Sequence, residues 1–364
     1  MQTPTLTCLA VSAALALGLC ASAQAQASDD VVRIGVMADQ TGPYSANGGP
    51  GSSLAVRMAV EDFGGKVLGK PIEVLVADDQ NKPDVGLNIA RKWLDVDKVD
   101  TIVGGSSSSI ALGVSSLMRE RSKPYLVAGT VTADLTNKAC TPMNVQFLTD
   151  TYALPRAGVQ ALMKQGIKSF YFITVDYAFG QAFQEDATRF IQAGGGKVVG
   201  SVKHPLGTTD FSSYLLQAQA SGAQAIVILN AGLDLSNALK QAAEYKLTRG
   251  GQMVSVFGMT INSVSAMGLD VAQGLQLTVP FYWDRDDASR AWSKRFMERY
   301  KNGVPTYIHA GAYSATLHYL NAVKAAGTDE GKAVAAKLHE LPVNDFFSKN
   351  VKVREDGQVM RPVY

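Results

Sequence analysis

The sequence predicts an α/β protein that contains two doubly wound parallel sheets. Short runs rich in β-branched residues alternate with helix-like stretches almost throughout the chain, and the alternation occurs in two successive rounds. The runs are continuously apolar, as expected for parallel strands that helices cover on both faces. The 364 residues are enough for two domains of ordinary size, each with its own core.

The first round contains four strand-like runs and ends near residue 150. Strands are expected at residues 31–38, 72–77, 101–103 and 125–127, and helices at residues 85–95 and 110–119. The stretch DQTGPYSANGGPGSSLAVRMAVEDFGG, residues 39–65, reads as a turn-rich loop followed by a helix with Ser52 or Ser53 as N-cap. It lacks the third glycine of a dinucleotide fingerprint, and Pro50 removes a donor N–H, so nucleotide binding is not expected.

The second round ends near residue 280. Strands are expected at residues 170–175, 197–202, 225–229, 254–257 and 275–279, and helices at residues 178–192, 214–220 and 235–245. Two amphipathic helices follow at residues 288–300 and 310–325, and we expect them to cover the open face of the first sheet. An Asp356-Gly357 hairpin turn then leads into a last strand. The sequence stops at Tyr364 as that strand begins, which suggests a shortened C-terminus.

The N-terminus has the pattern of a secretory signal peptide. An apolar run at residues 9–19 is followed by small residues at 21–27, so we expect cleavage after Ala25 or Ala27 and a periplasmic protein. A lipid anchor on Cys20 is disfavoured, because the bulky Leu19 precedes it. The mature chain then keeps one cysteine, Cys140, which cannot form an internal disulfide.

Composition and motifs argue against catalysis, metal and nucleic acid. The net charge is +2 and aromatic residues do not interleave with basic clusters. The serines after Gly104-Gly105 lack the downstream glycine of a hydrolase elbow, and the four histidines have no metal spacing. Asp78 and Asp79 point to opposite faces of a strand, and we expect both to be solvated. We therefore predict no enzyme, no cofactor and no bound metal; an exported enzyme is the disfavoured alternative.

Ligand binding fits the loops that follow the predicted strands. In open α/β sheets ligands lie beyond the carboxyl ends of the strands. The loops there are rich in small polar residues, and they occur at residues 104–109, 128–132, 176–180 and 230–232. The serine loop opens a helix, whose free N–H groups suit a carboxylate.

The chain resembles the periplasmic substrate-binding proteins of the branched-chain amino-acid type, which serve ABC importers. The resemblance runs from about Val31 to the end and rests on IGVMADQTGPYSANGGPGSSLAVRMAVEDFGG, GKPIEVLVADDQNKPDVG, VDYAFGQAFQED and HAGAYSATLHYLNAVKAAGT. It implies the type I periplasmic-binding-protein fold, in which two lobes joined by three crossovers close on a ligand in the cleft between them. The expected division is a signal peptide at 1–27, lobe 1 at 28–149 plus 282–340, and lobe 2 at 150–281 plus 341–364. The implied partners are a small-molecule ligand and a membrane permease, with the receptor a monomer.

The resemblance also implies a set of ligand-binding residues. The first lobe would supply Tyr44, Ser107, Ser108, Gly129, Thr130 and Thr132, with the Ser108 hydroxyl on the ligand's carboxylate. The second lobe would supply Tyr152, Tyr177, Phe179, Asn230, Phe257 and Met259. Similar chains continue to a cysteine that pairs with the counterpart of Cys140.

The identity of the ligand depends on charge. Amino-acid-binding members place acidic side chains near Tyr152 and in the segment that begins at Gly258, and this chain has none there. We therefore expect a carboxylate without an ammonium group, aromatic or branched, and we expect Asp176 and Asp234 to cap helices. The alternatives are an amino-acid-binding protein and a sensor that presents its ligand to a membrane receptor.

Overall fold

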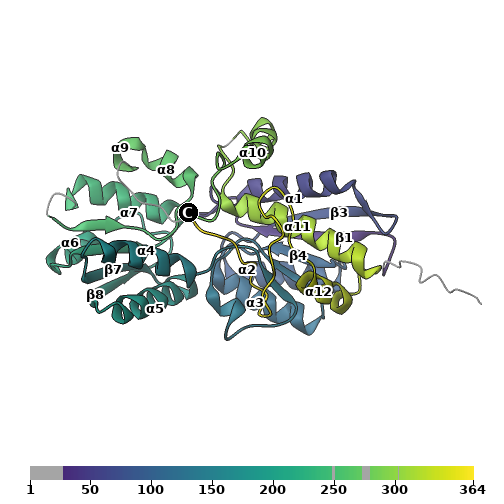
Figure 1. Ribbon diagram of the computed structural model, residues 1–364, viewed down its shortest axis with the longest axis horizontal. Coiled ribbons are helices and arrows are strands. Elements are labelled where there is room, and N and C mark those ends of the chain that lie inside the picture. Colours follow the sequence, from purple (N-terminus) through teal and green to yellow (C-terminus); the bar gives the residue numbers. More distant parts are fainter. Residues whose placement is uncertain (1–27, 248–250, 273–278, 302) are drawn as a thin grey trace, which may run out of the picture.

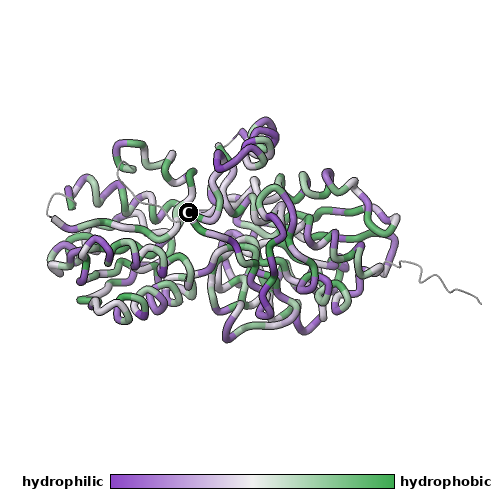
Figure 2. Tube along the Cα trace, in the orientation of Figure 1, coloured by the Kyte–Doolittle hydropathy of each residue, from purple (hydrophilic) through white to green (hydrophobic). Residues whose placement is uncertain are grey.

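The computed structural model describes residues 28–247, 251–272, 279–301 and 303–364, and it has two lobes, each built on a sheet (Figure 1). The predicted signal peptide lies outside these residues. Both sheets are parallel except for one short edge strand, and helices flank them, so the predicted fold class is confirmed. Hydrophobic positions run along the strands of both lobes (Figure 2). No helix among the described residues is long and apolar enough to cross a membrane.

The first lobe contains a six-stranded sheet of order β2-β3-β1-β4-β5-β6. The strands are β1 (Val32–Ala38), β2 (Lys66–Val67), β3 (Lys70–Asp78), β4 (Thr101–Gly104), β5 (Tyr125–Val127) and β6 (Asn144–Gln146). The central β1 pairs in parallel with β3 and β4. The four predicted strands are present within two residues at each end; β2 and β6 were not predicted.

Helices cover both faces of this sheet. They are α1 (Gly49–Phe63), α2 (Pro83–Asp95), α3 (Ser108–Glu120), α10 (Asp287–Arg299), α11 (Tyr307–Ala326) and α12 (Gly331–Glu340), with a short 3-10 turn, η1 (Ala133–Thr136). One core joins the sheet to α1, α10, α11 and α12, and the other joins it to α2 and α3. The two late helices therefore cover the first sheet, as predicted. The first helix begins at Gly49, so neither Ser52 nor Ser53 is its N-cap.

The second lobe contains a four-stranded parallel sheet of order β10-β9-β7-β8. The strands are β7 (Ser169–Val175), β8 (Lys197–His204), β9 (Ala225–Leu229) and β10 (Met253–Ser255). The helices are α4 (Ala153–Lys164), α5 (Ala178–Ala193), α6 (Ser212–Ala220), α7 (Gly232–Glu244), α8 (Ile261–Met267) and α9 (Leu269–Ala272). The strand predicted at 275–279 falls mostly outside the described residues.

The C-terminal segment differs from the expected assignment to the second lobe. The predicted hairpin turn is present, with Gly357 N donating to Arg354 O over 2.8 Å. Val343, Phe347 and Val359, however, pack into the core of the six-stranded sheet. This segment pairs with the outer edge of β6: Gln146 N donates to Gly357 O, and Val359 N donates to Gln146 O. Without the segment, these backbone groups of β6 would have no partner. Only the last residues reach Val279, through two backbone hydrogen bonds of Tyr364.

Candidate functional site

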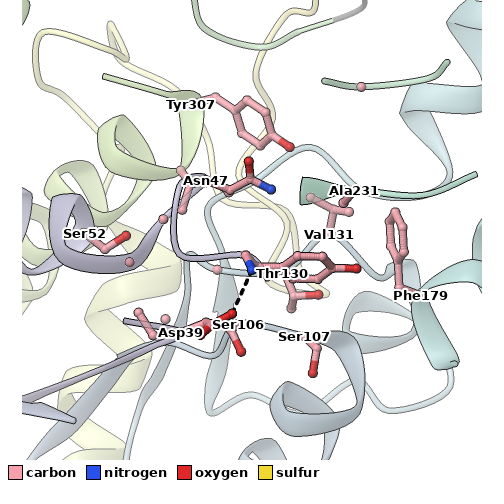
Figure 3. Close-up of a pocket in the computed structure, with 18 of the residues that line it drawn as sticks. Asp39, Asn47, Ser52, Ser106, Ser107, Thr130, Val131, Phe179, Ala231 and Tyr307 are labelled. Atoms are coloured by element: carbon pink, nitrogen blue, oxygen red, sulfur yellow. Dashed lines mark hydrogen bonds between the residues drawn. The ribbon is translucent and has the colours of Figure 1, made fainter. Parts of the chain in front are cut away.

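A cavity lies between the lobes, where the carboxyl ends of the strands of both sheets face each other. The space between its wall atoms amounts to about 750 Å³, including the opening to solvent. Figure 3 shows Ser107 and Thr130 of the first lobe facing Phe179 and Ala231 of the second. A ligand held here would touch both lobes at once.

All four predicted loops contribute to the cavity wall. Eight of the twelve residues proposed from the sequence line it, namely Tyr44, Ser107, Gly129, Thr130, Tyr177, Phe179, Asn230 and Phe257. They come together because the loops after β4, β5, β7 and β9 leave their sheets on the side that faces the other lobe. The fold thus brings together residues as far apart in the chain as Tyr44 and Phe257.

Ser108 and Thr132, by contrast, turn away from the cavity. The Ser108 hydroxyl is fully buried and lies 2.9 Å from the Thr130 hydroxyl. Thr132 caps η1, where its hydroxyl accepts from Asp134 N. Both side chains support wall segments; the Ser108 hydroxyl reaches the wall through Thr130, and its contact with a ligand stays a prediction.

Tyr152 and Met259 are also outside the cavity wall. Tyr152 is 39% exposed and packs edge-on against Phe190, with the ring centroids 5.0 Å apart. Tyr152 is the N-cap of α4 and lines a second hollow, together with Asp134 and Arg354, while Leu154, two residues later, lines the cavity. Met259 is buried in the core beside α6 and α7. A positive φ of 91° at Gly258 reverses the chain between Phe257, on the wall, and Met259.

The wall residues that were not predicted include Asp39, Asn47, Ser106, Phe183 and Tyr307. Phe183 extends an aromatic row on the second lobe, with centroid separations of 5.9 Å from Tyr177 to Phe179 and 5.2 Å from Phe179 to Phe183. Phe183 follows Phe179 by four residues on one helix, so the two side chains share a face; this spacing could have predicted Phe183 from the sequence. Tyr307 comes from α11, and only the return of the chain to the first lobe brings it here.

Four helix N-termini point into the cavity, two from each lobe. Gly48, Ser107, Tyr177 and Ala231 are the N-caps of α1, α3, α5 and α7, and all four line the wall. Gly48 and Ala231 have no side chain that could cap a helix, and those of Ser107 and Tyr177 make no capping bond. The N–H groups of a first turn carry partial positive charge, and in α7 one of them, Leu233 N, already donates to Pro43 O over 3.3 Å. Among the described wall residues there is no Lys, Arg or His, so the attraction for an anion comes from the backbone.

Asp39 is the one acidic residue of the described wall. Its carboxylate accepts from Gly42 N over 2.5 Å and from Tyr44 N over 2.8 Å, which shapes the turn that carries Tyr44. The side chain is 1% exposed, and burial raises the pKa of the carboxyl, with Asp78 adding to the rise. Both oxygens are therefore already partnered by backbone donors.

The other acids that were considered lie elsewhere. Asp176 pairs with Lys203, and Asp234 accepts from Gly207 N over 2.9 Å; neither caps a helix, contrary to expectation. Asp79 is not solvated as expected but fully buried, and it accepts from the Ser106 hydroxyl over 2.5 Å. No group of three or more potential metal ligands occurs within the described residues.

Direct contacts hold the lobes together around the cavity. The hydroxyls of Tyr44 and Tyr177 lie 2.7 Å apart. Thr260 Oγ1 donates to Asn47 Oδ1 over 2.9 Å, and Asn262 Nδ2 donates to Ala46 O over 2.9 Å. These are contacts of a closed cleft.

Gly232 permits this closure. It has a φ of 61°, and a Cβ at this position would come within 2.6 Å of Pro43 O and of the Tyr44 ring. A larger residue would therefore push the loop of the second lobe away from that of the first.

Comparisons with known proteins agree with this architecture. A family model described as "Periplasmic binding protein" matches residues 31–364. A periplasmic binding protein from Burkholderia mallei is 43% identical, with a TM-score of 0.89 over 92% of this chain and 88% of that chain. A branched chain amino acid ABC transporter periplasmic ligand-binding protein from Burkholderia xenovorans LB400 is 38% identical, with a TM-score of 0.80 over 92% of this chain and 89% of that chain.

A solute binding protein from R. palustris, solved in complex with benzoate, has the same fold at 20% identity, with a TM-score of 0.84 over 92% of both chains. Such proteins deliver small molecules to the permeases of ABC transporters. The match over nearly the whole chain, together with a two-lobed fold that has a cavity between the lobes, establishes that this chain belongs to the periplasmic binding protein family and is a solute-binding protein of an ABC transporter.

Proposed function

We propose that the protein captures a small carboxylate without an ammonium group, with an aromatic or branched body, and that closure of the lobes retains it for delivery to the permease. The observation that carries the proposal is the convergence of four helix N-termini without side-chain caps on a wall that has no basic side chain. Backbone N–H groups at a helix N-terminus bind carboxylates without a counter-charged side chain.

Ser107 is the best-placed hydroxyl donor for that carboxylate. It is the N-cap of α3, it lines the cavity, and its side chain makes no capping bond to the helix. Thr130 stands beside it on the wall, where the Ser108 hydroxyl orients it from behind. Two hydroxyls and the first-turn N–H groups thus form a cradle for two carboxylate oxygens.

The body of the ligand would lie against the aromatic side chains. Phe179, Phe183 and Phe257 form one wall from the second lobe, and Tyr44 and Tyr307 belong to the opposite side. Flat apolar rings favour offset or edge-on packing with another ring. The R. palustris protein solved with benzoate shares the fold, so a ligand of this shape is compatible with the architecture.

Charge provides the argument against an ammonium. A buried ammonium needs a carboxylate or several free acceptors. Asp39 is the acid on the described wall, and both its oxygens already accept backbone N–H groups. The second candidate is an amino-acid ligand: Asp39 is its possible partner, and the Burkholderia xenovorans relative is described as belonging to a branched-chain amino-acid transporter.

The functional unit proposed here is one exported chain. The cavity is complete within that chain, so a monomer suffices. The lobes would hinge at the crossings near residues 149 and 280 and at the C-terminal segment. We propose the lobe division given above, with residues 343–359 moved to the first lobe, because Val343, Phe347 and Val359 pack into its core.

A thermal-shift comparison tests the ligand class, because a ligand that binds the folded state raises the melting temperature. Benzoate, 4-hydroxybenzoate, 3-phenylpropionate and 4-methylpentanoate are compared with phenylalanine and leucine. The last two acids are the deaminated counterparts of the two amino acids, so each pair isolates the ammonium. Stabilisation by the amino acids alone would reject the proposal and favour the second candidate.

A further inference from the structure

Ser28, the first described residue, is hydrogen-bonded to the buried carboxylate of Asp329, 301 positions later in the chain. Its backbone nitrogen lies 2.7 Å from Asp329 Oδ1 and 2.8 Å from Oδ2, and its hydroxyl donates to Oδ2 over 3.1 Å. Asp329 is 2% exposed and lies just before α12. These contacts fasten the start of β1 to the end of the α11–α12 connection.

The geometry around Ser28 suits an ammonium better than a peptide group. A peptide nitrogen carries one hydrogen, which two equidistant acceptors must share as a three-centre bond. An ammonium carries three and can direct one at each carboxylate oxygen. Charge-assisted bonds of that kind are about twice as strong as neutral ones.

The local charge balance is also one cation short. Asp329 neighbours a second buried carboxylate, Asp100, which is 2% exposed. Lys123 Nζ lies 2.8 Å from Asp100 Oδ1 and neutralises that group. Burial raises the pKa of the Asp100 carboxyl, and Asp329 adds to the rise. Buried carboxylates are costly unless each has a cationic partner.

The remaining charged groups nearby are committed to other partners. Arg33 pairs with Asp29 and Glu73, and Lys70 pairs with Asp30. Glu330 caps α12 through Lys332 N and Ala333 N. The Tyr319 hydroxyl is buried without a hydrogen-bond partner, and burial raises its pKa, with Asp100 and Asp329 adding to the effect. None of these ion pairs gives Asp329 a cationic side-chain partner.

We propose that the leader is cleaved after Ala27, and that Asp329 is the receptor for the α-ammonium of Ser28 in the exported protein. Cleavage after Ala25 would leave Ser28 nitrogen as a neutral peptide group and would keep the pocket one cation short. The new N-terminus then locks β1 to α12 and completes the first lobe after export. This inference rests on export through a cleaved leader and not on the class of ligand.

The first test is the N-terminus itself. The full precursor is exported from a bacterial host, purified from the periplasm, and analysed by intact mass and N-terminal sequencing. A chain that begins at Ser28 supports the proposal. A chain that begins at Gln26, or elsewhere, overturns it.

The second test measures the lock without any ligand. Two forms are released from a fusion by a protease that leaves no extra residue, one starting at Ser28 and the other at Gln26. We expect the unfolding equilibrium constant of the Ser28 form to be about tenfold lower at pH 7, as for one charge-assisted bond. An α-ammonium has an ordinary pKa of about 7.7–8.0, and the facing carboxylates raise it. The advantage is therefore complete below about pH 7 and disappears as the pH rises through the raised pKa.

Two variants distinguish the bond between the Ser28 ammonium and Asp329 from any general effect of the two extra residues in the Gln26 form. Asp329→Asn, made in both forms, should reduce the difference between them to less than about twofold. Asp30→Asn is the matched control, because Asp30 is close in sequence but its side chain is 99% exposed; it should leave the difference intact. Equal stability of the two wild-type forms overturns the proposal even if Asp329→Asn fails to fold. Neither result bears on the ligand, so the proposed function stands or falls separately.

Discussion

The hydroxyls of Tyr44 and Tyr177, which lie 133 positions apart in the chain and belong to different lobes, are 2.7 Å from each other. Each ring also lines the cavity, so the pair closes one side of it. Burial raises the pKa of both phenols, which keeps them neutral and able to share one hydrogen bond. The pair is therefore both a wall of the site and a clasp between the lobes.

Removing either hydroxyl should weaken the closed form. We expect Tyr44→Phe and Tyr177→Phe each to reduce ligand affinity by about two- to tenfold, because a neutral hydrogen bond contributes about 0.5–1.5 kcal/mol. Isothermal titration calorimetry with the acid that gives the largest thermal shift measures the effect. The double variant should lose little more than either single variant, since both remove the same bond. If the losses of affinity in the two single variants add up in the double variant, the two hydroxyls act separately. Tyr245→Phe is the control, because Tyr245 does not line the cavity.

Alanine substitutions at Ser107, Ser108 and Ser109 should reduce ligand affinity to different extents. Ser107→Ala should reduce affinity for a carboxylate by about ten- to a hundredfold, since a hydrogen bond to a charged group contributes about 1.5–3 kcal/mol. Ser108→Ala should have a smaller effect, because this hydroxyl acts through Thr130. Ser109→Ala is the matched control, a half-exposed neighbour that is not on the cavity wall. An unchanged affinity in Ser107→Ala would show that the backbone N–H groups bind the anion without it.

Asn262 makes a contact between the lobes that lies outside the cavity, so changing it should affect lobe closure without removing a wall residue. Its side chain donates to Ala46 O across the cleft but does not line the cavity. We expect Asn262→Ala to increase the dissociation rate about two- to tenfold and to shift the ligand-free protein toward a larger radius of gyration in small-angle scattering. Ser265→Ala is the control, because the Ser265 hydroxyl bonds within α8 to Ile261 O. If both variants dissociate at the wild-type rate, this contact is not part of the clasp.

His309 should make the stability of the first lobe depend on pH. Its ring nitrogens bond to Thr306 N and Gly48 O, and burial lowers its pKa to about 4 from an ordinary 6.5. The unfolded chain therefore binds the proton first, and stability is full above about pH 6.5 and falls as the pH drops toward 4. The full effect is about 3 kcal/mol, at 1.36 kcal/mol per pKa unit.

Asp186 acts in the opposite direction, since burial raises its pKa to about 6 from 3.8. Its contribution is present below about pH 4 and is lost as the pH rises through 6. Urea unfolding between pH 4 and pH 7 should therefore be compared for wild type and His309→Gln, so that the term from Asp186 cancels. Equal slopes in the two proteins would contradict the assignment to His309.

Tyr152 should be dispensable for binding. It was proposed as a ligand contact, but its ring packs against Phe190 and Arg189 and does not line the cavity. Tyr152→Ala should change affinity by less than about twofold, since a surface substitution away from the site has an effect within about 0.5 kcal/mol. Phe179→Ala, on the cavity wall, is the positive control. A large loss of affinity in Tyr152→Ala would place this residue in the site.

Features that depend on residues close together in the sequence were predicted, and features that depend on contacts between distant segments were not. Strands and helices were predictable because apolar continuity and helical spacing are local patterns. The carboxyl-end rule then placed four loops at one site before any contact was known. The sequence alone also indicated that helices α10 and α11 had to return to the first sheet, since no second-lobe strand remained for them to cover.

Only the tertiary structure decided which side chains of those loops face the cavity. Successive residues at a helix start point about 100° apart, so a rotation of one position decides that Ser107 lines the cavity and Ser108 does not. The C-terminal segment was misplaced for a related reason: its alternating pattern fits any open strand edge, and the unpaired edge of β6 was closer than the second lobe. The sequence by itself therefore determined the two-lobed architecture and the location of the cavity. The inward-facing residues, the tyrosine clasp and the capture of Ser28 depend on contacts between segments far apart in the chain, which no local pattern records.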